Sequence, residues 1–78
     1  MEIKVTEISE DSIKGIVVNG GIIFKTDEEI TVKGINSTSM DENGKNISKD
    51  MVICFSCSEK DIEAENVVNI SNFSIKQN

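Results

Sequence analysis

Cys54 and Cys57 have the C-x-x-C spacing of half a zinc site or of a dithiol redox pair. A structural zinc site needs four ligands, usually Cys and His, and the chain has no third Cys and no His. Zinc would therefore need carboxylates or a second subunit. A redox pair normally opens a helix, whereas residues 51–57 form an apolar, strand-like run. We interpret both cysteines as buried, small apolar side chains and predict no metal and no cofactor.

A second set of side chains resembles a calcium-binding loop. With Gly44 at the sixth position, Asp41, Asn43 and Asp50 fall at positions three, five and twelve. The first ligand would then be Ser39, and the position that is normally apolar holds a polar residue. We interpret this segment as a polar hairpin tip around Asn43-Gly44.

The side chains that most enzymes use are missing from the composition. The chain has no His, Arg, Trp or Tyr, so no side chain titrates near neutral pH without a perturbed environment. Its serines lack a His to activate them. Gly20-Gly21 lies where a hairpin is expected and not before a helix, as a phosphate-binding loop would. The sequence therefore predicts a protein that is not an enzyme.

Acidic residues dominate the charge, with fourteen Asp and Glu against eight Lys and a net charge of −6. Nucleic acids and anionic membranes are disfavoured as ligands, because both attract basic proteins. A solvated surface is the simplest reason for acidic segments, and an acidic patch that docks a basic protein is the functional alternative. The candidate partner-binding residues are Asp27, Glu28, Glu29, Glu59, Asp61, Glu63 and Glu65.

The composition predicts that these residues lie on strands and in the turns between them. The chain has thirteen Ile, seven Val, one Ala and no Leu, and β-branched residues favour sheets whereas Leu and Ala favour helices. We predict one all-β domain over residues 1–78, a small antiparallel barrel or sandwich of five to six strands, SH3-like or OB-like. The expected strands are 2–8, 13–18, 21–26, 30–35, 51–57 and 67–75.

Turn signals separate these strands. Asn19-Gly20 predicts a two-residue hairpin, in which Phe24 would lie across from Gly15 and cover it. Residues 9–12 form another turn. Ser58 followed by Asp61 resembles an N-cap with an acidic N3 residue, so a short helix over 58–66 is one option. A phase slip at Ser71-Asn72 suggests a bulge in the last strand.

The expected hairpin of residues 13–24 is apolar on both faces. Ile13, Val17, Ile22 and Phe24 share one face in the predicted register, and a chain of 78 residues can cover two apolar faces only with difficulty. Either the barrel wraps closely or a face meets another chain. We expect a homo-oligomer, most simply a two-fold dimer, whose interface includes Ile16, Val18 and Ile23.

The first residues lack the apolar segment of a signal peptide, and no apolar run is long enough to span a bilayer. Two Cys in such a chain suggest reduced thiols in a cytoplasm. Abundant Ile, Lys and Asn without Arg would fit AT-rich coding DNA, such as that of a low-GC bacterium or its phage. The expected compartment is therefore a bacterial cytoplasm.

These features favour a non-enzymatic acidic protein that acts through protein–protein contact, such as a phage-encoded inhibitor of a host or immune protein. One alternative is an oligomer that binds a nucleotide or metabolite between subunits, with Lys14, Lys25 or Lys33 supplying polar contacts. A second alternative is a structural subunit of a phage or another assembly.

Overall fold

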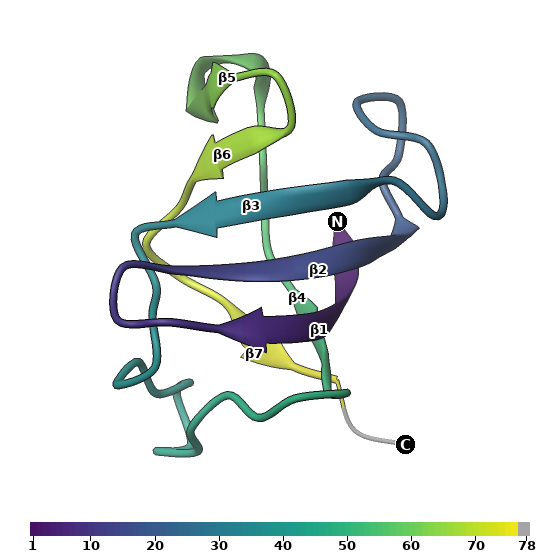
Figure 1. The fold of residues 1–78 in the computed structure, drawn as a ribbon. Coiled ribbons are helices and arrows are strands. Elements are labelled where there is room, and N and C mark those ends of the chain that lie inside the picture. Colours follow the sequence, from purple (N-terminus) through teal and green to yellow (C-terminus); the bar gives the residue numbers. More distant parts are fainter. Residues whose placement is uncertain (77–78) are drawn as a thin grey trace.

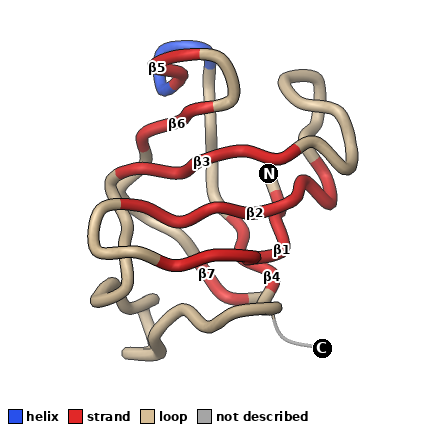
Figure 2. Tube along the Cα trace, in the orientation of Figure 1, coloured by secondary structure: helices blue, strands red, loops and turns tan. Residues whose placement is uncertain are grey.

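The protein is an all-β protein, as its composition predicts. The computed structural model describes residues 1–76, in which the chain forms strands, loops and one short 3-10 helix (Figures 1 and 2). The elements are β1 (Glu2–Ile8), β2 (Ser12–Asn19), β3 (Glu29–Lys33), β4 (Val52–Cys54), η1 (Glu59–Asp61), β5 (Ile62–Ala64), β6 (Val67–Asn69) and β7 (Ser74–Ile75).

The strands form one mixed sheet in the order β5-β6-β3-β2-β1-β4-β7. Residues 1–76 form seven strands where five to six are expected, and β3 pairs with β6 in parallel, so the prediction of a wholly antiparallel sheet is wrong. The end strands β5 and β7 do not pair with each other, so the hydrogen bonding does not close into a barrel. The sheet is strongly bent, with β1, β2 and β3 on one side and β4 and β7 behind them (Figure 1).

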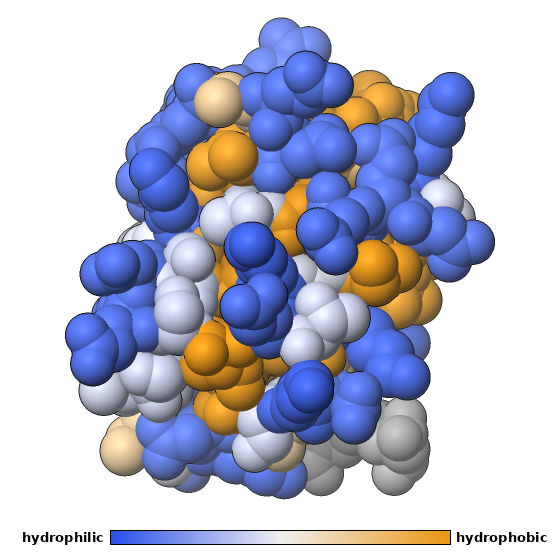
Figure 3. All heavy atoms as spheres, viewed as in Figure 1, coloured by the Kyte–Doolittle hydropathy of each residue, from blue (hydrophilic) through white to orange (hydrophobic). Residues whose placement is uncertain are grey.

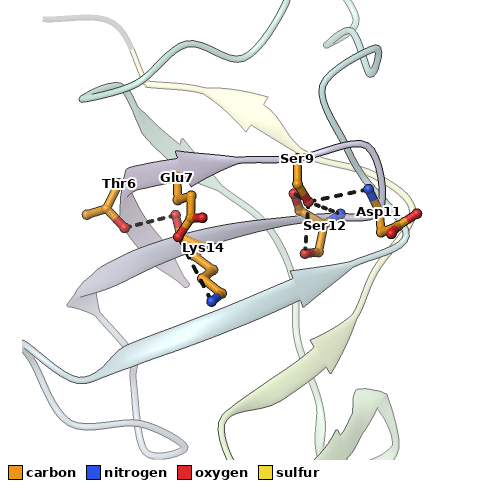
Figure 4. A network of polar contacts seen from close by, with 6 residues as sticks. All are labelled: Thr6, Glu7, Ser9, Asp11, Ser12 and Lys14. Carbon is orange, nitrogen blue, oxygen red and sulfur yellow. Dashed lines mark hydrogen bonds and ion pairs between the residues drawn. The ribbon is translucent and has the colours of Figure 1, made fainter.

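β1 and β2 form a hairpin whose turn was predicted at residues 9–12. The hydroxyl of Ser9 accepts hydrogen bonds from the backbone N–H groups of Asp11 (3.4 Å) and Ser12 (3.1 Å), and Ser9 N–H donates to the Ser12 carbonyl (2.9 Å) (Figure 4). An exposed ion pair joins Lys14 on β2 to Glu7 on β1 at 3.9 Å. The turn prediction is confirmed, because Ser9 supplies the side-chain acceptor that a tight turn needs.

The core lies on the inner face of the bent sheet and follows the alternation of the strands. β1 buries Ile3 and Val5, and β2 buries Ile13 and Val17. Gly15 lies between these two β2 residues, where a Cβ would come within 2.7 Å of the Lys4 carbonyl oxygen and 2.9 Å of the Ile3 side chain. The other buried apolar side chains are Phe24, Ile30, Val32, Ile35, Ile47, Ile53, Phe55, Val68, Ile70 and Ile75.

The predicted hairpin at Asn19-Gly20 is wrong, and so is the expected strand over 21–26. β2 pairs with β3, and Gly15 lies opposite Ile30 instead of Phe24. Residues 20–28 form the loop between the two strands, which we call the β2–β3 loop. Phe24 is buried in the core, and its backbone packs against Gly20 so tightly that a Cβ on Gly20 would clash with it. Burial of Phe24 therefore outweighs the local preference of Asn-Gly for a two-residue turn.

The segment between β3 and β4 contains a tight turn at Asp41, and two of its isoleucines, Ile35 and Ile47, are buried in the core. The carboxylate of Asp41 accepts hydrogen bonds from the backbone N–H groups of Asn43 (3.0 Å) and Lys45 (2.8 Å), and Gly44 has φ of 76°. The predicted turn at Asn43-Gly44 is confirmed. Asp41 is buried because its charge is satisfied by these backbone donors.

Two further predictions are corrected near the C-terminus. The short helix is a single 3-10 turn, η1, which begins after Ser58. The Asp61 carboxylate accepts hydrogen bonds from the Ser58 N–H (2.9 Å) and hydroxyl (3.1 Å), as the N-cap pattern predicted. Residues 67–75 are two strands and not one with a bulge, because the chain crosses between β6 and β7 at residues 70–73. β6 pairs with β3, whereas β7 pairs with β4.

Candidate interaction site

Ile22 is the most exposed hydrophobic side chain among residues 1–76, at 104% relative exposure. The backbone N–H groups of Ile23 (3.1 Å) and Phe24 (3.4 Å) both donate to the Gly20 carbonyl, which folds residues 20–24 into a single tight turn. Phe24 anchors this turn in the core, and Ile22 lies outside it. The predicted register placed Ile22 on the buried face with Ile13 and Val17, so that prediction is wrong.

Beside Ile22 lies a groove of about 490 Å³ between the β2–β3 loop and the segment that leads into η1. We call it the Ile22 groove. Its apolar lining comes from Ile22, Ile23, Cys57 and Ile62, and its polar lining comes from Ser58 and Glu59. A second hollow shares Ile22, Ile23 and Cys57 with it and continues along Met1, Glu2 and residues 19–21. An exposed apolar side chain therefore stands next to an apolar groove, as at many protein-binding surfaces.

Cys57 contributes a half-buried thiol to the Ile22 groove. Burial raises the pKa of this thiol, the Asp61 carboxylate raises it further, and the N-terminal ammonium opposes both. The thiol also donates to the Ser58 carbonyl at 3.7 Å. Because only the thiolate is a strong nucleophile or metal ligand, Cys57 is suited to apolar packing. Cys54 is also half-buried, and both cysteines are free thiols.

The raised pKa of Cys57 predicts slow alkylation. In a Cys54→Ser protein, the rate of reaction of Cys57 with iodoacetamide should rise at a higher pH than that of a short cysteine peptide. Mass spectrometry of the alkylated protein across a pH series measures this. Asp61→Asn should move the profile toward lower pH, since it removes a negative charge that disfavours the thiolate. The prediction would be contradicted if the alkylation rate of Cys57 rose at the same pH as that of the peptide or at a lower pH.

The three residues expected at an oligomer interface lie in two places. Ile16 and Val18 lie on the outer face of β2, where Ile16 is half-buried and Val18 is 44% exposed. Ile16 is flanked by Lys4 of β1 and Glu29 of β3. Ile23 instead lines the Ile22 groove. Figure 3 shows hydrophobic residues on this side of the molecule as separate areas among hydrophilic ones.

Three of the seven candidate acidic residues are already engaged within the protein. A Glu28 carboxylate oxygen accepts a hydrogen bond from the Lys25 N–H (3.0 Å), and Asp61 caps η1. Glu63 pairs with Lys33 at 3.4 Å and accepts a hydrogen bond from the Asn69 side chain at 2.7 Å. These contacts, the one with Asn69 above all, lower the pKa of Glu63.

The other four acidic residues are exposed. Within residues 1–76, no hydrogen bond or ion pair occupies the carboxylates of Asp27, Glu29, Glu59 and Glu65. Asp27 belongs to the β2–β3 loop and Glu29 begins β3. Glu59 lines the Ile22 groove, and Glu65 lies in the turn before β6, the strand that pairs with β3. The sequence pattern does not distinguish these seven residues, because it does not show which carboxylates have partners inside the fold.

The structure also places the candidate metal ligands. In the described part of the chain, no three Cys, Asp or Glu side chains gather closely enough to hold a metal ion. In the segment that resembles a calcium loop, the Asp41 carboxylate binds backbone N–H groups, and Asp50 is exposed with φ of 71°. Asp41 therefore has a structural role in its turn.

The lysines considered for a small ligand do not converge. Lys14 pairs with Glu7 on the outer face of the β1–β2 hairpin, and Lys33 pairs with Glu63 at the end of β3. Lys25 is exposed in the β2–β3 loop. They lie on different elements and share no hollow among those found in the described residues.

No helix within residues 1–76 combines the length and the apolar character that crossing a bilayer requires. Comparisons of the chain with protein families, curated proteins and solved structures found no match.

Proposed function

We propose that this chain is a non-enzymatic acidic protein that acts by contact with a basic surface of another protein. The observation that supports this best is the β2–β3 loop and its flank, which carry the exposed Ile22 together with the unoccupied carboxylates of Asp27 and Glu29. Burial of an aliphatic side chain gives affinity, and a surrounding field of one sign steers a partner of opposite charge.

The composition supports a role without catalysis. The chain has no His or Arg, and the pKa of Cys57, its half-buried thiol in the Ile22 groove, is raised rather than lowered. An activated nucleophile requires the opposite shift. Since both cysteines are free thiols, we expect the contact to occur in a reducing cytoplasm.

A pair of charge-matched variants tests the proposal. The patch variant replaces the four unoccupied carboxylates by amides: Asp27→Asn, Glu29→Gln, Glu59→Gln and Glu65→Gln. The control variant makes four equivalent changes elsewhere: Glu10→Gln, Asp11→Asn, Glu42→Gln and Asp50→Asn. Both lose four negative charges, so only the position of the charge differs. The control residues lie in the β1–β2 turn and in the connection before β4.

The wild-type protein is used as bait in a bacterial lysate, and the retained protein is identified, purified and titrated calorimetrically with all three forms. We expect a basic partner whose Kd rises by about tenfold for the patch variant and hardly changes for the control variant. Failure to retain any protein, or an equal effect of the two variants on Kd, would contradict the proposal.

Two finer expectations belong to this proposal. An inhibitor of a host or immune protein is its most specific form, since such an inhibitor needs only a surface and no catalytic side chain. The bent sheet, with strands on both sides of one core, supports a small barrel-like scaffold of the SH3 or OB type for that surface.

A further inference from the structure

We propose that the Ile22 groove is the anchoring site of the contact and that it takes one bulky aliphatic side chain of the partner, flanked there by lysine or arginine. This inference rests on the proposed function and names the segment that would be recognised. Ile22 itself would close over the incoming side chain from the side of the β2–β3 loop. The inference depends on the apolar lining, the charge of the rim and the position of Ile22.

The lining of the groove fits an aliphatic group. Ile23, Cys57 and Ile62 are each half-buried, so each keeps apolar surface that faces the groove. The thiol of Cys57 remains neutral near physiological pH because its pKa is raised, and it therefore adds no charge to this lining. Covering these three side chains together with Ile22 would remove a continuous apolar surface from water.

The negative charge near the groove favours a partner segment with basic residues on either side of its aliphatic side chain. Among residues 1–76, Glu59 is the one charged side chain that lines the Ile22 groove. The adjoining hollow is lined by Glu2 and by Met1, whose N-terminal ammonium donates to the Phe55 carbonyl at 2.9 Å. Glu2 is paired with Lys76 at 3.1 Å, which leaves Glu59 unoccupied. The flanking residues 25–29 and 59–61 carry five carboxylates against the amines of Lys25 and Lys60.

Another hollow of the protein, with a mixed polar and apolar lining, shows the contrast. It lies between the connection before β4 and the end of β7, where Met51, Val52 and Ile75 line it together with three lysines and Asp50. An aliphatic segment with basic neighbours would be repelled there and attracted at the Ile22 groove. Charge complementarity therefore assigns a cationic, aliphatic segment to the groove and argues against a second copy of this acidic chain.

Three synthetic peptides serve as probes: Lys-Lys-Leu-Lys-Lys, Lys-Lys-Ser-Lys-Lys and Glu-Glu-Leu-Glu-Glu. Each is titrated into protein labelled with ¹³C at the δ1 methyl groups of its thirteen isoleucines. We expect the first peptide to shift the methyl signals of Ile22, Ile23 and Ile62 in a saturable way. The serine peptide should leave these three signals almost unmoved, and the acidic peptide should not bind.

Two variants complete the design. Ile22→Ser should raise the Kd of the leucine peptide by at least about fivefold, since it removes apolar surface that binding would bury. Met40→Ser is the matched control, because Met40 is another exposed hydrophobic side chain, at 59% exposure, and lies in the connection between β3 and β4. The control should leave the Kd unchanged. Neither side chain is part of the core, so both variants should fold.

The outcomes separate this inference from the proposed function. Equal binding of the leucine and serine peptides would overturn the anchoring role of the groove, yet leave an acidic contact surface in place. Shifts confined to other isoleucines would overturn it too. If the three methyl signals instead moved with protein concentration alone, and the molecular mass doubled, the groove would belong to a second copy and the inference would fail.

Discussion

Gly34→Ala is expected to lower the free energy of unfolding by about 3–5 kcal/mol. Gly34 follows β3 with φ of 89°, a conformation that L-residues avoid. A Cβ at this position would lie 1.8 Å from the Ile70 carbonyl oxygen, which cannot move aside as a flexible side chain could. The Ile70 N–H donates to the Lys33 carbonyl at 2.9 Å, so a shift here disrupts the junction of β3 and β6.

Gly44→Ala is the control that measures the conformational cost of a positive φ without a steric clash. Gly44 has φ of 76°, but a Cβ there would meet no atom within 4 Å. Its cost should therefore be the conformational penalty alone, about 1–2 kcal/mol. Urea unfolding followed by circular dichroism measures both variants, and the chain has no Trp or Tyr for a fluorescence signal. Equal losses for the two glycines would show that the contact with Ile70 contributes nothing.

Ile53→Ala should lower the free energy of unfolding by about 3–4 kcal/mol. Ile53 is completely buried on β4, between Ile3 of β1 and Ile75 of β7. Its removal leaves a cavity among three strands, and two of these strands have only two or three residues each. A domain of 78 residues has a total stability of roughly 4–12 kcal/mol, so this loss removes about a quarter of the stability at the upper end of that range and nearly all of it at the lower end.

Ile22→Ala makes the same chemical change at a fully exposed site and serves as the control for Ile53→Ala. It should change the free energy of unfolding by less than about 0.5 kcal/mol. Thermal unfolding of the two variants under one set of conditions gives the comparison. A large loss of stability for Ile22→Ala would mean that this side chain packs inside the protein, and it would remove the basis for the groove as a binding site.

Local patterns predicted the first half of the sheet well. β1 covers the predicted residues 2–8, and β2 and β3 begin and end within one or two residues of their expected bounds. Alternating Ile and Val mark one inner face on β1 and β3, so the buried residues Ile3 and Val32 could be read from the periodicity, whereas β2 carries Ile or Val on both faces. The Ser9 and Asp41 turns follow from side chains that bind the backbone a few residues away.

Local sequence patterns gave wrong predictions where a strand pairs with a segment that is distant along the chain. Asn19-Gly20 is a strong local signal for a hairpin, but Phe24 is buried in the core, and β2 pairs with β3 instead of with residues 21–26. The phase slip at residues 71–72 marks a break between two strands that pair with β3 and β4. The parallel pairing of β3 with β6 joins segments more than thirty residues apart, and no local pattern encodes it.

The all-β class, the acidic balance and the absence of histidine follow from the sequence alone, because composition is fixed by the chain and backbone preferences act within a few residues. Tertiary packing places Ile22 outside the core beside an apolar groove, and within residues 1–76 it leaves four of the seven candidate carboxylates without a partner. Exposure and pairing depend on which distant segments pack together, and that packing is settled by the burial of side chains such as Phe24 across the whole fold.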